Sequence, residues 1–406
     1  MLIGIDDTDS VKGGCTTYLA ALLCRKFEPL SFPKLIRLNP NIPFKTRGNG
    51  AVAVELEGDL DVVKKFTLRL VEKYSYLNDS KTNPGVVFVD KLAGKERDVL
   101  NDFYLKAVSQ LVEIKEADEL AGKVGAEVFK YKNGRGVIGA LAAVGSRIVD
   151  KTYEFIAYRG EKARGPRKLD LNSVFEMNNR VYPKTFDNVD LETKQVLITP
   201  HGYDPLFCGI RGESPEVVEK AWKMLRPLED ISLMQIFESN QGTDVHLRVK
   251  KISEIRPYDC VVFEGVVSTK PKTISGGHVF FEVEDGSGVI SCGAYEPTGG
   301  FRSVVRQLMV GDVVRCFGGV GRYPGTVNLE KLFVCGLARE TVFVVPNCCS
   351  KKMTSAGRGK GYKCRKCGKR TREAKTTEIK RNLKAGWYEV PPRARRHLSK
   401  PLVRQI

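Results

Sequence analysis

LIGIDDTDS (residues 2–10), continued by VKGGCTTYLAALLCRKF (residues 11–27), is the stretch that decides how this chain begins to fold. Leu2 to Ile5 predicts a short buried strand, and the apolar run Tyr18 to Phe27 predicts a helix that begins at a threonine pair. A strand, a polar turn and a helix in this order indicate an α/β domain, which we expect to cover residues 1–125. Further elements of that domain are predicted at Ala51 to Leu56, Leu60 to Tyr74, Gly85 to Val89 and Glu96 to Glu113.

Asp6, Asp7 and Asp9 come directly after the predicted strand. Three carboxylates within four residues repel one another, and a bound cation removes that repulsion. Hard oxygen ligands favour Mg²⁺ over Zn²⁺, so we predict Asp7 and Asp9 as magnesium ligands. The alternative reading is an ordinary acidic surface turn.

A glycine pair, Gly13 and Gly14, precedes the predicted helix, whose first turn carries Thr16 and Thr17. Free backbone N–H groups and the positive end of a helix dipole bind phosphate well. Together with the carboxylates, this start predicts a Mg²⁺–nucleotide site. An ordinary helix cap is the alternative.

A second loop carries Lys45, Thr46 and Arg47, and the Gly48 and Gly50 that follow permit close approach of the backbone. Two cations in a flexible turn could neutralise phosphate charge during phosphoryl transfer. No GxxxxGK[ST] pattern is present, so the chain does not contain a P-loop. A solvated basic turn is the alternative for this motif.

The middle of the chain, residues 126–252, reads as strand, helix, strand, strand, helix, strand, the order of a ferredoxin-like unit. The predicted elements are Val128 to Tyr131, Gly136 to Val144, Thr152 to Tyr158, Val196 to Thr199, Pro215 to Leu225 and Ser232 to Phe237. An insertion, Arg159 to Gln195, interrupts this order and could pack with the first domain. Insertions of that length are more often functional than idle.

Residues 253–340 carry short strands separated by glycines, in the order three strands, a helix and two strands. That order is typical of an OB barrel. The predicted strands are Val261 to Lys270, Val279 to Glu284, Gly288 to Tyr295, Val313 to Gly318 and Thr326 to Val334, and the helix is Phe301 to Leu308. In this fold the connections Pro271 to Gly277 and Gly321 to Gly325 flank the nucleic-acid face. A small barrel with a purely structural role is the alternative.

The loop that leaves the third ferredoxin-like strand combines one histidine, one aspartate, one arginine and several glycines, as small-ligand pockets do. The candidate ligand-binding residues are His201, Gly202, Asp204, Arg211 and Glu213. The Asp204 carboxylate could bind an ammonium or guanidinium group. A structured turn with capping roles is the alternative.

Positive charge is concentrated at the C-terminal end of the 406 residues. The whole chain has 66 Lys and Arg against 48 Asp and Glu, and residues 341–406 hold 19 of the basic and 3 of the acidic residues. A polyanion is the natural partner of such a segment, and nucleic acid is the commonest. Stacking aromatics beside cations fit RNA. The predicted contacts are Lys363, Arg365, Lys366, Trp387, Arg393, Arg395, Arg396 and Lys400.

Cys364 and Cys367 form half of a zinc knuckle, for which Cys348 and Cys349 are the candidate second pair. Because these two are adjacent, they cannot form the usual CxxC loop, so a four-sulfur zinc site would be strained. A three-cysteine site completed by His397 or water, and a basic ribbon without metal, are the alternatives. The other cysteines lie in apolar surroundings, no leader is apparent and no apolar run reaches about 18 residues. We therefore expect a cytoplasmic protein that does not enter the membrane.

Taken together, these motifs resemble one family, the archaeal tRNA(Ile) 2-agmatinylcytidine synthetases. The resemblance rests on GIDDTDS (4–10), CTTYL (15–19), LIRLNPNIPFKTRGNGA (35–51), GVIGALAAVG (136–145), KTFDNVD (184–190), TPHGYDPLFCGIRGE (199–213) and MTSAGRGKGYKCRKC (353–367). It implies a multidomain α+β protein with an N-terminal α/β kinase-like domain, a ferredoxin-like domain, an OB-fold barrel and a C-terminal zinc-ribbon-like module. One departure is Pro346, where the family's first knuckle usually has a cysteine.

The resemblance implies a ligase that uses ATP to join agmatine to C2 of the wobble cytidine of a tRNA(Ile) with a CAU anticodon, so that the tRNA reads AUA. It implies that ATP is cleaved to AMP, that C2 is activated by phosphorylation and that Thr16 is autophosphorylated. Asp6, Asp7, Asp9 and Thr16 would then be catalytic, Gly13, Gly14, Lys45, Thr46 and Arg47 would bind ATP, and the pocket around Asp204 would bind agmatine.

Two rival functions leave part of the sequence unexplained. A non-catalytic RNA-binding protein built on the OB fold and ribbon gives no role to Asp6, Asp7, Asp9, Lys45 or Asp204. An enzyme that ligates or nucleotidylates RNA ends would act on a terminus rather than on an internal base.

Overall fold

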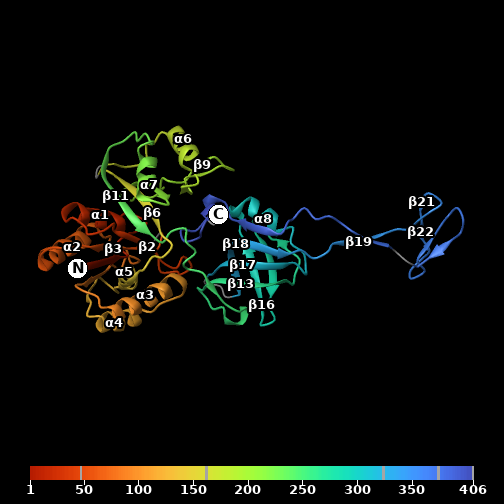
Figure 1. Ribbon diagram of the computed structural model, residues 1–406, viewed down its shortest axis with the longest axis horizontal. Helices are drawn as coiled ribbons and strands as arrows, with labels where there is room; N and C mark the ends of the chain where they lie inside the picture. Colours follow the sequence, from red (N-terminus) through yellow and green to blue (C-terminus); the bar gives the residue numbers. More distant parts are fainter. Residues whose placement is uncertain (46–47, 161–162, 322–324, 373–374, 405–406) are drawn as a thin grey trace.

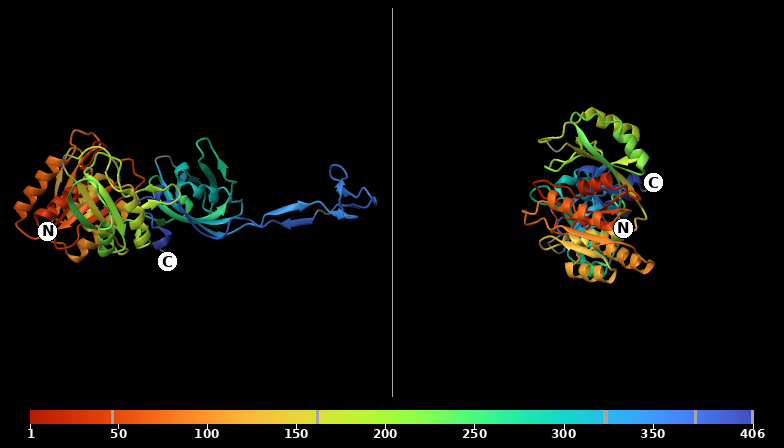
Figure 2. Two further views of the ribbon diagram at one scale, coloured as in Figure 1. Left: turned by 90° about the horizontal axis from the view of Figure 1, so that it is seen from above. Right: turned by 90° about the vertical axis from the view of Figure 1, so that its left-hand side faces the viewer.

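The computed structural model describes residues 1–45, 48–160, 163–321, 325–372 and 375–404 (Figure 1). A nine-stranded sheet with helices on its faces leads into a β-barrel, and a thin two-stranded arm carries a small ribbon away from the barrel (Figures 1 and 2). In the described part of the chain, no helix is long and apolar enough to cross a membrane.

The first half of the sheet has β1 at its centre, antiparallel to β3 on one side and to β4 on the other, with β2 and β5 beyond them. These strands are β1 (Leu2–Asp6), β2 (Lys34–Arg37), β3 (Gly50–Glu55), β4 (Gly85–Val89) and β5 (Glu127–Lys130). One core joins the sheet to α1 (Thr16–Lys26) and α2 (Leu60–Tyr74). The other joins it to α3 (Gly94–Ser109), α4 (Ile114–Lys123) and α5 (Gly136–Gly145).

The helix predicted over Glu96 to Glu113 is two helices, α3 and α4. The chain turns extended after Ser109, and this break lets Val112 and Ala117 reach the same core as α3. Burial of apolar side chains therefore ends the helix before its sequence pattern does.

Helix α5 lies directly against β1, β3 and β4, and all of its residues are buried. The approach depends on glycines: a Cβ at Gly139 would lie 1.9 Å from Asp6 Oδ2, and one at Gly85 would lie 2.0 Å from the Val137 nitrogen. The start of α5 is thereby held next to the carboxylates that end β1.

This packing corrects the predicted ferredoxin-like order. The strand predicted over Val128 to Tyr131 is β5, which pairs with β4 at the far edge of the sheet, and the helix after it covers β1. Neither lies beside the strands with which the sequence order grouped them.

The second half of the sheet consists of β11, β6, β10 and β7, with β11 parallel to β2 where the two halves join. Helices α6 and α7 share a core with these strands. The elements are β6 (Thr152–Arg159), α6 (Leu171–Val181), β7 (Thr185–Phe186), β8 (Val189–Asp190), β9 (Gln195–Val196), β10 (Leu206–Gly212), α7 (Pro215–Trp222) and β11 (Ile231–Ser239).

The third strand of this half is not where the sequence predicted it. Residues 195–196 form only the short hairpin partner of β8, whereas β10, predicted as a loop, pairs along β6. Phe207, Cys208 and Ile210 are buried in β10, and Gly209 lies against the Glu154 side chain. Gly209, whose presence suggested a loop, is needed in the strand because a Cβ at this position would lie 2.5 Å from Glu154 Oε1.

The insertion after β6 packs mainly on its own half of the molecule, because α6 shares the core with α7. Among the described residues of the insertion, those up to Arg167 approach the N-terminal half across a large cavity.

The predicted OB barrel is confirmed. Strands β13, β17, β18, β16 and β15 follow one another around the barrel, and the pairing of β13 with β15 closes it. The elements are β12 (Arg248–Val249), η1 (Ile252–Glu254), β13 (Cys260–Val267), β14 (Lys272–Thr273), β15 (Val279–Glu284), β16 (Val289–Ala294), η2 (Glu296–Thr298), α8 (Gly300–Val305), β17 (Val313–Val320) and β18 (Thr326–Gly336). The second predicted nucleic-acid loop, Gly321 to Gly325, contains residues 322–324, which lie outside the described part of the chain.

The arm is formed by β19 (Thr341–Val344) and β25 (Lys375–Glu378), and the ribbon at its end by β20 (Asn347–Cys348), β21 (Lys351–Lys352), β22 (Thr354–Ser355), β23 (Tyr362–Lys363) and β24 (Arg370–Thr371). The chain then returns: β26 (Gly386–Glu389) pairs with β18, and η3 (Pro392–Ala394) and η4 (Leu402–Arg404) lead to a C terminus near the barrel and the first sheet (Figure 1). Residues 341–406, predicted as one module, therefore contain both the ribbon and a segment built into the body.

Candidate functional site

A cavity of about 240 Å³ lies where β1 ends and where α1 and α5 begin. Its acidic side is made of Asp6, Asp7 and Asp9. The loop before β3 and the start of β10 close the other sides. The structure thus brings the predicted carboxylates, the first turn of α1 and part of the second loop into one space.

The backbone conformation of this turn holds the carboxylates close together. Asp7 has φ of 59°, its N–H donates to Asp6 Oδ1 at 2.7 Å, and its own Oδ2 accepts from the Asn83 N–H at 3.0 Å. Burial, together with the neighbouring Asp9 charge, raises the pKa of Asp7 to about 7, and burial with the Asp7 charge raises the pKa of Asp6 well above its ordinary value. A site that disfavours its own negative charges in this way fits a divalent cation.

The start of α1 places Thr16 and Thr17 on the cavity wall, with Thr16 Oγ1 3.0 Å from Thr8 Oγ1. Gly13 and Gly14 allow the tight turn before α1 and do not line this cavity. Gly13 and Gly14 have φ of 147° and 77°, and a Cβ at Gly13 would lie 2.5 Å from the Tyr76 hydroxyl. Gly14 borders a neighbouring cavity, whereas Gly13 lines neither of the two.

Three cations line the cavity together with the carboxylates: Arg37, Lys45 and Arg135. Lys45 donates to the Pro40 carbonyl, and Arg135 lies over the Phe44 ring at 4.2 Å. Burial lowers the pKa of all three groups, since each gives up hydration at the cavity wall. Thr46 and Arg47, predicted to bind ATP, lie outside the described residues.

Arg37 and Arg135 were missed by sequence reasoning. Arg135 immediately precedes the glycine-rich helix α5, which is the kind of signal that could have found it. Arg37 is an isolated arginine at the end of β2, and nothing in its local sequence marks it.

A second cavity, of about 1,150 Å³, adjoins the first and is lined by His201, Gly202 and Asp204. Asp204 lines both cavities. Its Oδ1 accepts from Arg167 at 2.9 Å and from the Leu206 N–H at 3.1 Å, so the carboxylate is held firmly between the two spaces.

Arg211 and Glu213, predicted with Asp204 as one pocket, line neither cavity among the described residues. Arg211 lies 3.7 Å from both Glu154 and Asp187, and Glu213 accepts from Arg404 at 2.5 Å. Both residues contact the C-terminal segment, since Arg211 also lies 2.8 Å from His397 Nδ1. The structure does not place them beside Asp204 in either cavity, and their assignment as ligands of the same molecule stays a prediction.

The basic tail, predicted to contact RNA, is largely paired within the chain. Arg393 binds Asp190 at 2.7 Å, Lys400 binds Asp150 at 2.9 Å, Arg395 pairs with Glu389 at 2.8 Å, and Arg396 donates to Asn41. Trp387 lies against Phe317 and Phe333 on the barrel and is 40% exposed. Lys363, Arg365 and Lys366 are exposed on the ribbon and remain open to a polyanion.

His397 is placed far from the cysteines and lines the first cavity. The alternative in which it completes a three-cysteine metal site is therefore wrong. Its position in the cavity was missed, because only the return of the chain past the barrel brings residue 397 next to residues 37 and 48.

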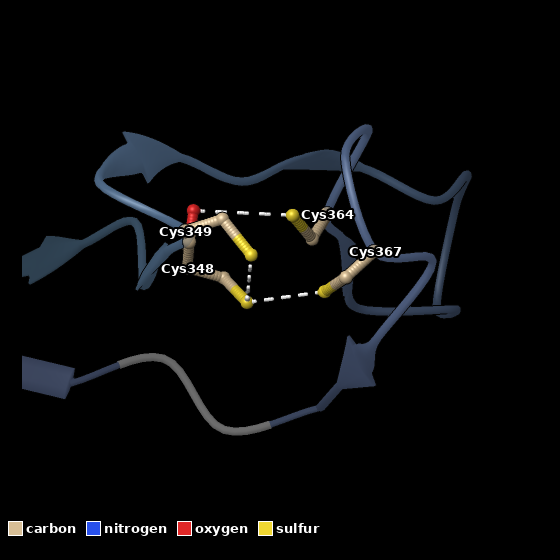
Figure 3. A group of neighbouring side chains, drawn as sticks. All are labelled: Cys348, Cys349, Cys364 and Cys367. Atoms are coloured by element: carbon tan, nitrogen blue, oxygen red, sulfur yellow. Dashed lines mark hydrogen bonds between the residues drawn. The ribbon is translucent and has the colours of Figure 1, made fainter.

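The four cysteines of the ribbon come together, with sulfur atoms all within 4.8 Å of one another (Figure 3). Positive φ angles at Cys349 (50°) and Ser350 (61°) bend the chain so that adjacent cysteines can face one centre. N–H groups of Cys367 and Lys366 lower the pKa of Cys364 to about 7. Four thiol groups in this arrangement fit Zn²⁺, and the strain expected for an adjacent pair is absorbed by the backbone.

We predict that the purified protein binds one zinc ion and that Cys364→Ser loses it, because three remaining thiolates hold zinc far more weakly than four. Inductively coupled plasma mass spectrometry measures the number of zinc ions per protein chain. Cys335→Ser, on the barrel, is the matched control and keeps the metal. Equal zinc content in Cys364→Ser and the parent protein would contradict the assignment.

Four family models match the chain in order. They describe the TiaS TCKD domain (residues 2–66), the TiaS FLD domain (134–246), an OB-fold nucleic acid binding domain (261–332) and the TiaS C-terminal zinc ribbon domain (345–383).

The chain is similar over its whole length to the tRNA(Ile) 2-agmatinylcytidine synthetases TiaS. It is 46% identical to that of Thermococcus sibiricus, covering 99% of this chain and 95% of the relative, and 46% identical to that of Methanosarcina mazei, covering 100% and 97%. A crystal structure of TiaS in complex with tRNA(Ile) and ATP matches with a TM-score of 0.92 and 43% identity, covering 99% and 97%. The complex of TiaS with tRNA(Ile), AMPCPP and agmatine matches with 0.88 and 41%, covering 99% and 96%.

Proposed function

The chain belongs to the tRNA(Ile) 2-agmatinylcytidine synthetase family, and from this premise we propose how its cavities perform the reaction. It is a tRNA(Ile) agmatidine synthetase, a ligase that uses ATP and agmatine on tRNA. The observation that carries the proposal is the single cavity in which Asp6, Asp7, Asp9, Thr16 and Lys45 meet.

We propose that ATP places its phosphates in this cavity, between the carboxylates and the cations. Asp7 and Asp9 would hold Mg²⁺, which supplies charge neutralisation to the phosphate oxygens when bound. Arg37 and Lys45 stand opposite and orient the same phosphates electrostatically. The α1 start adds the positive end of a helix dipole, which supports the same placement.

Thr16 is the proposed phosphoryl acceptor within the protein. Its hydroxyl lies in the cavity, 3.0 Å from the Thr8 hydroxyl, which can hold it in one orientation. The two phosphoryl groups lost as ATP becomes AMP would then have separate acceptors: one passes to water by way of the Thr16 hydroxyl, and the other passes to the C2 oxygen of the wobble cytidine. Once phosphorylated, that oxygen leaves as phosphate when the agmatine amine attacks C2 and loses a proton.

Agmatine is proposed to bind beside Asp204, where the two cavities meet. It is a dication near neutral pH, and Asp204 is a buried carboxylate open to both spaces. Tyr203, which is 80% exposed, and the Arg164 side chain of the insertion line the larger cavity, where the anticodon could enter. His201 and Gly202 line the same entrance.

We expect Asp204→Asn to raise the apparent agmatine constant about 30- to 5,000-fold while changing the ATP constant little, because removing one partner of a desolvated charge pair typically costs about 2–5 kcal/mol. Steady-state kinetics with agmatine and ATP varied in turn measure both constants.

The substitution also leaves the buried Arg167 with a weaker partner, so folding needs its own control. Asp312→Asn alters a comparable buried carboxylate–arginine pair on the barrel, distant from both cavities. It should lower the melting temperature without moving the agmatine constant. If Asp204→Asn also leaves that constant unchanged, agmatine binds elsewhere.

The proposed function is tested by mass analysis of the wobble nucleoside after incubation of tRNA(Ile), ATP and agmatine with the protein. The expected product carries agmatine in place of the C2 oxygen, and ATP consumption requires both tRNA and agmatine. An RNA-binding protein without catalysis would leave the nucleoside unchanged.

A further inference from the structure

The returning segment, residues 391–404, lies across the body and is bound to it by ion pairs and hydrogen bonds. We call it the C-terminal strap. Its basic side chains bind acidic residues of the sheet half that carries β6 and β10, and its backbone is held as well. The His397 carbonyl accepts from the Gly242 N–H at 2.7 Å, and the Leu398 carbonyl accepts from the Asp244 N–H at 2.8 Å. Leu398 and Ser399 are 1% exposed. The strap thereby fixes where the His397 ring lies.

The hydrogen bonds of His397 determine which of its nitrogens carries a proton. Arg211 lies 2.8 Å from Nδ1, and a guanidinium group can only donate, so Nδ1 accepts. The positive charges of Arg37 and Arg211, together with burial, lower the pKa of His397 well below its ordinary value. The ring is therefore neutral, and its one proton is on Nε2.

The Nε2 edge of the ring faces the first cavity, which the proposed function makes the active site and which we call the active cavity. A Cβ built on Gly48 would lie 3.2 Å from Nε2, and Gly48 and His397 both line the cavity. Within the part of the chain that the structure describes, Nε2 has no hydrogen-bond partner. Arg37 donates to the Gly48 carbonyl at 2.7 Å, and the charge of Lys45 also acts on the ring, so the N–H group lies in a positively charged corner.

We propose that His397 is an anion-binding residue of the active cavity, whose Nε2–H donates a hydrogen bond to a phosphate oxygen, and that the C-terminal strap holds it in place. The proposal rests on the proposed function, in which phosphates occupy this cavity. The phosphate can come from ATP or from the RNA backbone beside the target cytidine. A neutral donor suits this corner, because a further positive charge would be repelled by the two neighbouring cations.

The test uses the full chain with His397→Phe, which keeps the ring and removes both nitrogens. Equilibrium binding is measured for ATP, for adenosine and for tRNA(Ile). We expect ATP affinity to fall about 10- to 100-fold, the range for a hydrogen bond to a charged group, with adenosine affinity unchanged. If the phosphate belongs to the RNA, the tRNA affinity falls instead and ATP affinity is retained. Unchanged ATP and tRNA affinities, or equal losses for ATP and adenosine, would overturn the proposal.

Two further variants separate phosphate binding from a purely structural role. The Gln side chain places its amide near the position of Nε2, whereas that of Asn reaches only the position of Nδ1. Phosphate binding predicts that His397→Gln recovers much of the affinity and that His397→Asn does not. A role limited to accepting from Arg211 predicts the reverse order.

His278→Phe is the matched control, because His278 accepts from the Glu296 N–H at 2.9 Å on the barrel, outside the cavity. It should leave ATP affinity unchanged. Failure of the proposed function would show separately, as normal ATP cleavage in variants that lack the Asp7 or Asp9 carboxylate.

Discussion

Replacing Asp7 or Asp9 with alanine is expected to stop ATP cleavage, lowering the rate on the order of 1,000-fold, while tRNA binding stays nearly intact. Both carboxylates line the same cavity as Lys45 and Arg37, and the metal they would hold stabilises phosphate charge by several kcal/mol. The exposed cations of the ribbon are far along the arm and do not depend on these residues (Figure 1). ATP cleavage measured with saturating tRNA and agmatine, beside tRNA binding by filter retention, gives both quantities.

Asp118→Asn is the matched control, because that carboxylate pairs with Lys130 on the surface of α4 and does not reach the cavity. It should keep both activities. Asp7 also accepts the Asn83 N–H, so melting curves are needed to show that the alanine variants remain folded. Weakened tRNA binding with undiminished ATP cleavage in Asp7→Ala would remove the carboxylates from the reaction.

Deleting the ribbon is expected to weaken tRNA binding at least about 100-fold while the body stays folded. Residues 345–374 contain ten basic residues and one acidic residue. Cations that contact phosphates release counterions, and this release supplies most of the affinity for a polyanion.

The structure indicates where the cut should be made. Val344 pairs with Lys375 at the end of the arm, so an Asn-Gly turn can replace residues 345–374 and close β19 and β25 as a hairpin. Removing everything after residue 340 would also remove β26 from the barrel and His397 from the cavity. That larger truncation would confuse loss of tRNA binding with loss of the active site.

Substitutions within the ribbon allow the contribution of single cations to tRNA binding to be measured from its salt dependence. Changing Lys363, Arg365 and Lys366 to alanine should reduce the slope of log affinity against log salt by roughly 2 to 3, at about 0.7 to 0.9 for each phosphate that is no longer neutralised. A hairpin-closed protein that keeps both the affinity and the slope of the parent would show that the ribbon does not anchor the tRNA. The basic residues at the start of the insertion would then be the next region to test.

What the sequence determined by itself is local. The turn after β1, with Asp6, Asp7 and Asp9, could be found because the carboxylates lie close together and directly follow a buried strand. The OB barrel could be found because its strands and helix follow one another along one segment of the chain in the order typical of that fold, with alternating apolar residues and glycine turns marking the strands. The ribbon cysteines could be found as ligands, although their adjacency hid the backbone turn that unites them.

What only the tertiary structure decided is which distant segments meet. The strand β5 and helix α5 join the N-terminal half because glycines allow α5 to lie against β1, and β10 is a strand because β6 offers it a partner. The strap's cations bind acidic residues far away in the sequence, and this return puts His397 beside Arg37. Composition states how many charges a segment has, whereas their partners depend on packing between segments hundreds of residues apart. The same basic tail is thus read from sequence as an RNA contact, whereas in the fold its cations pair with acidic residues of the body and His397 lines the first cavity.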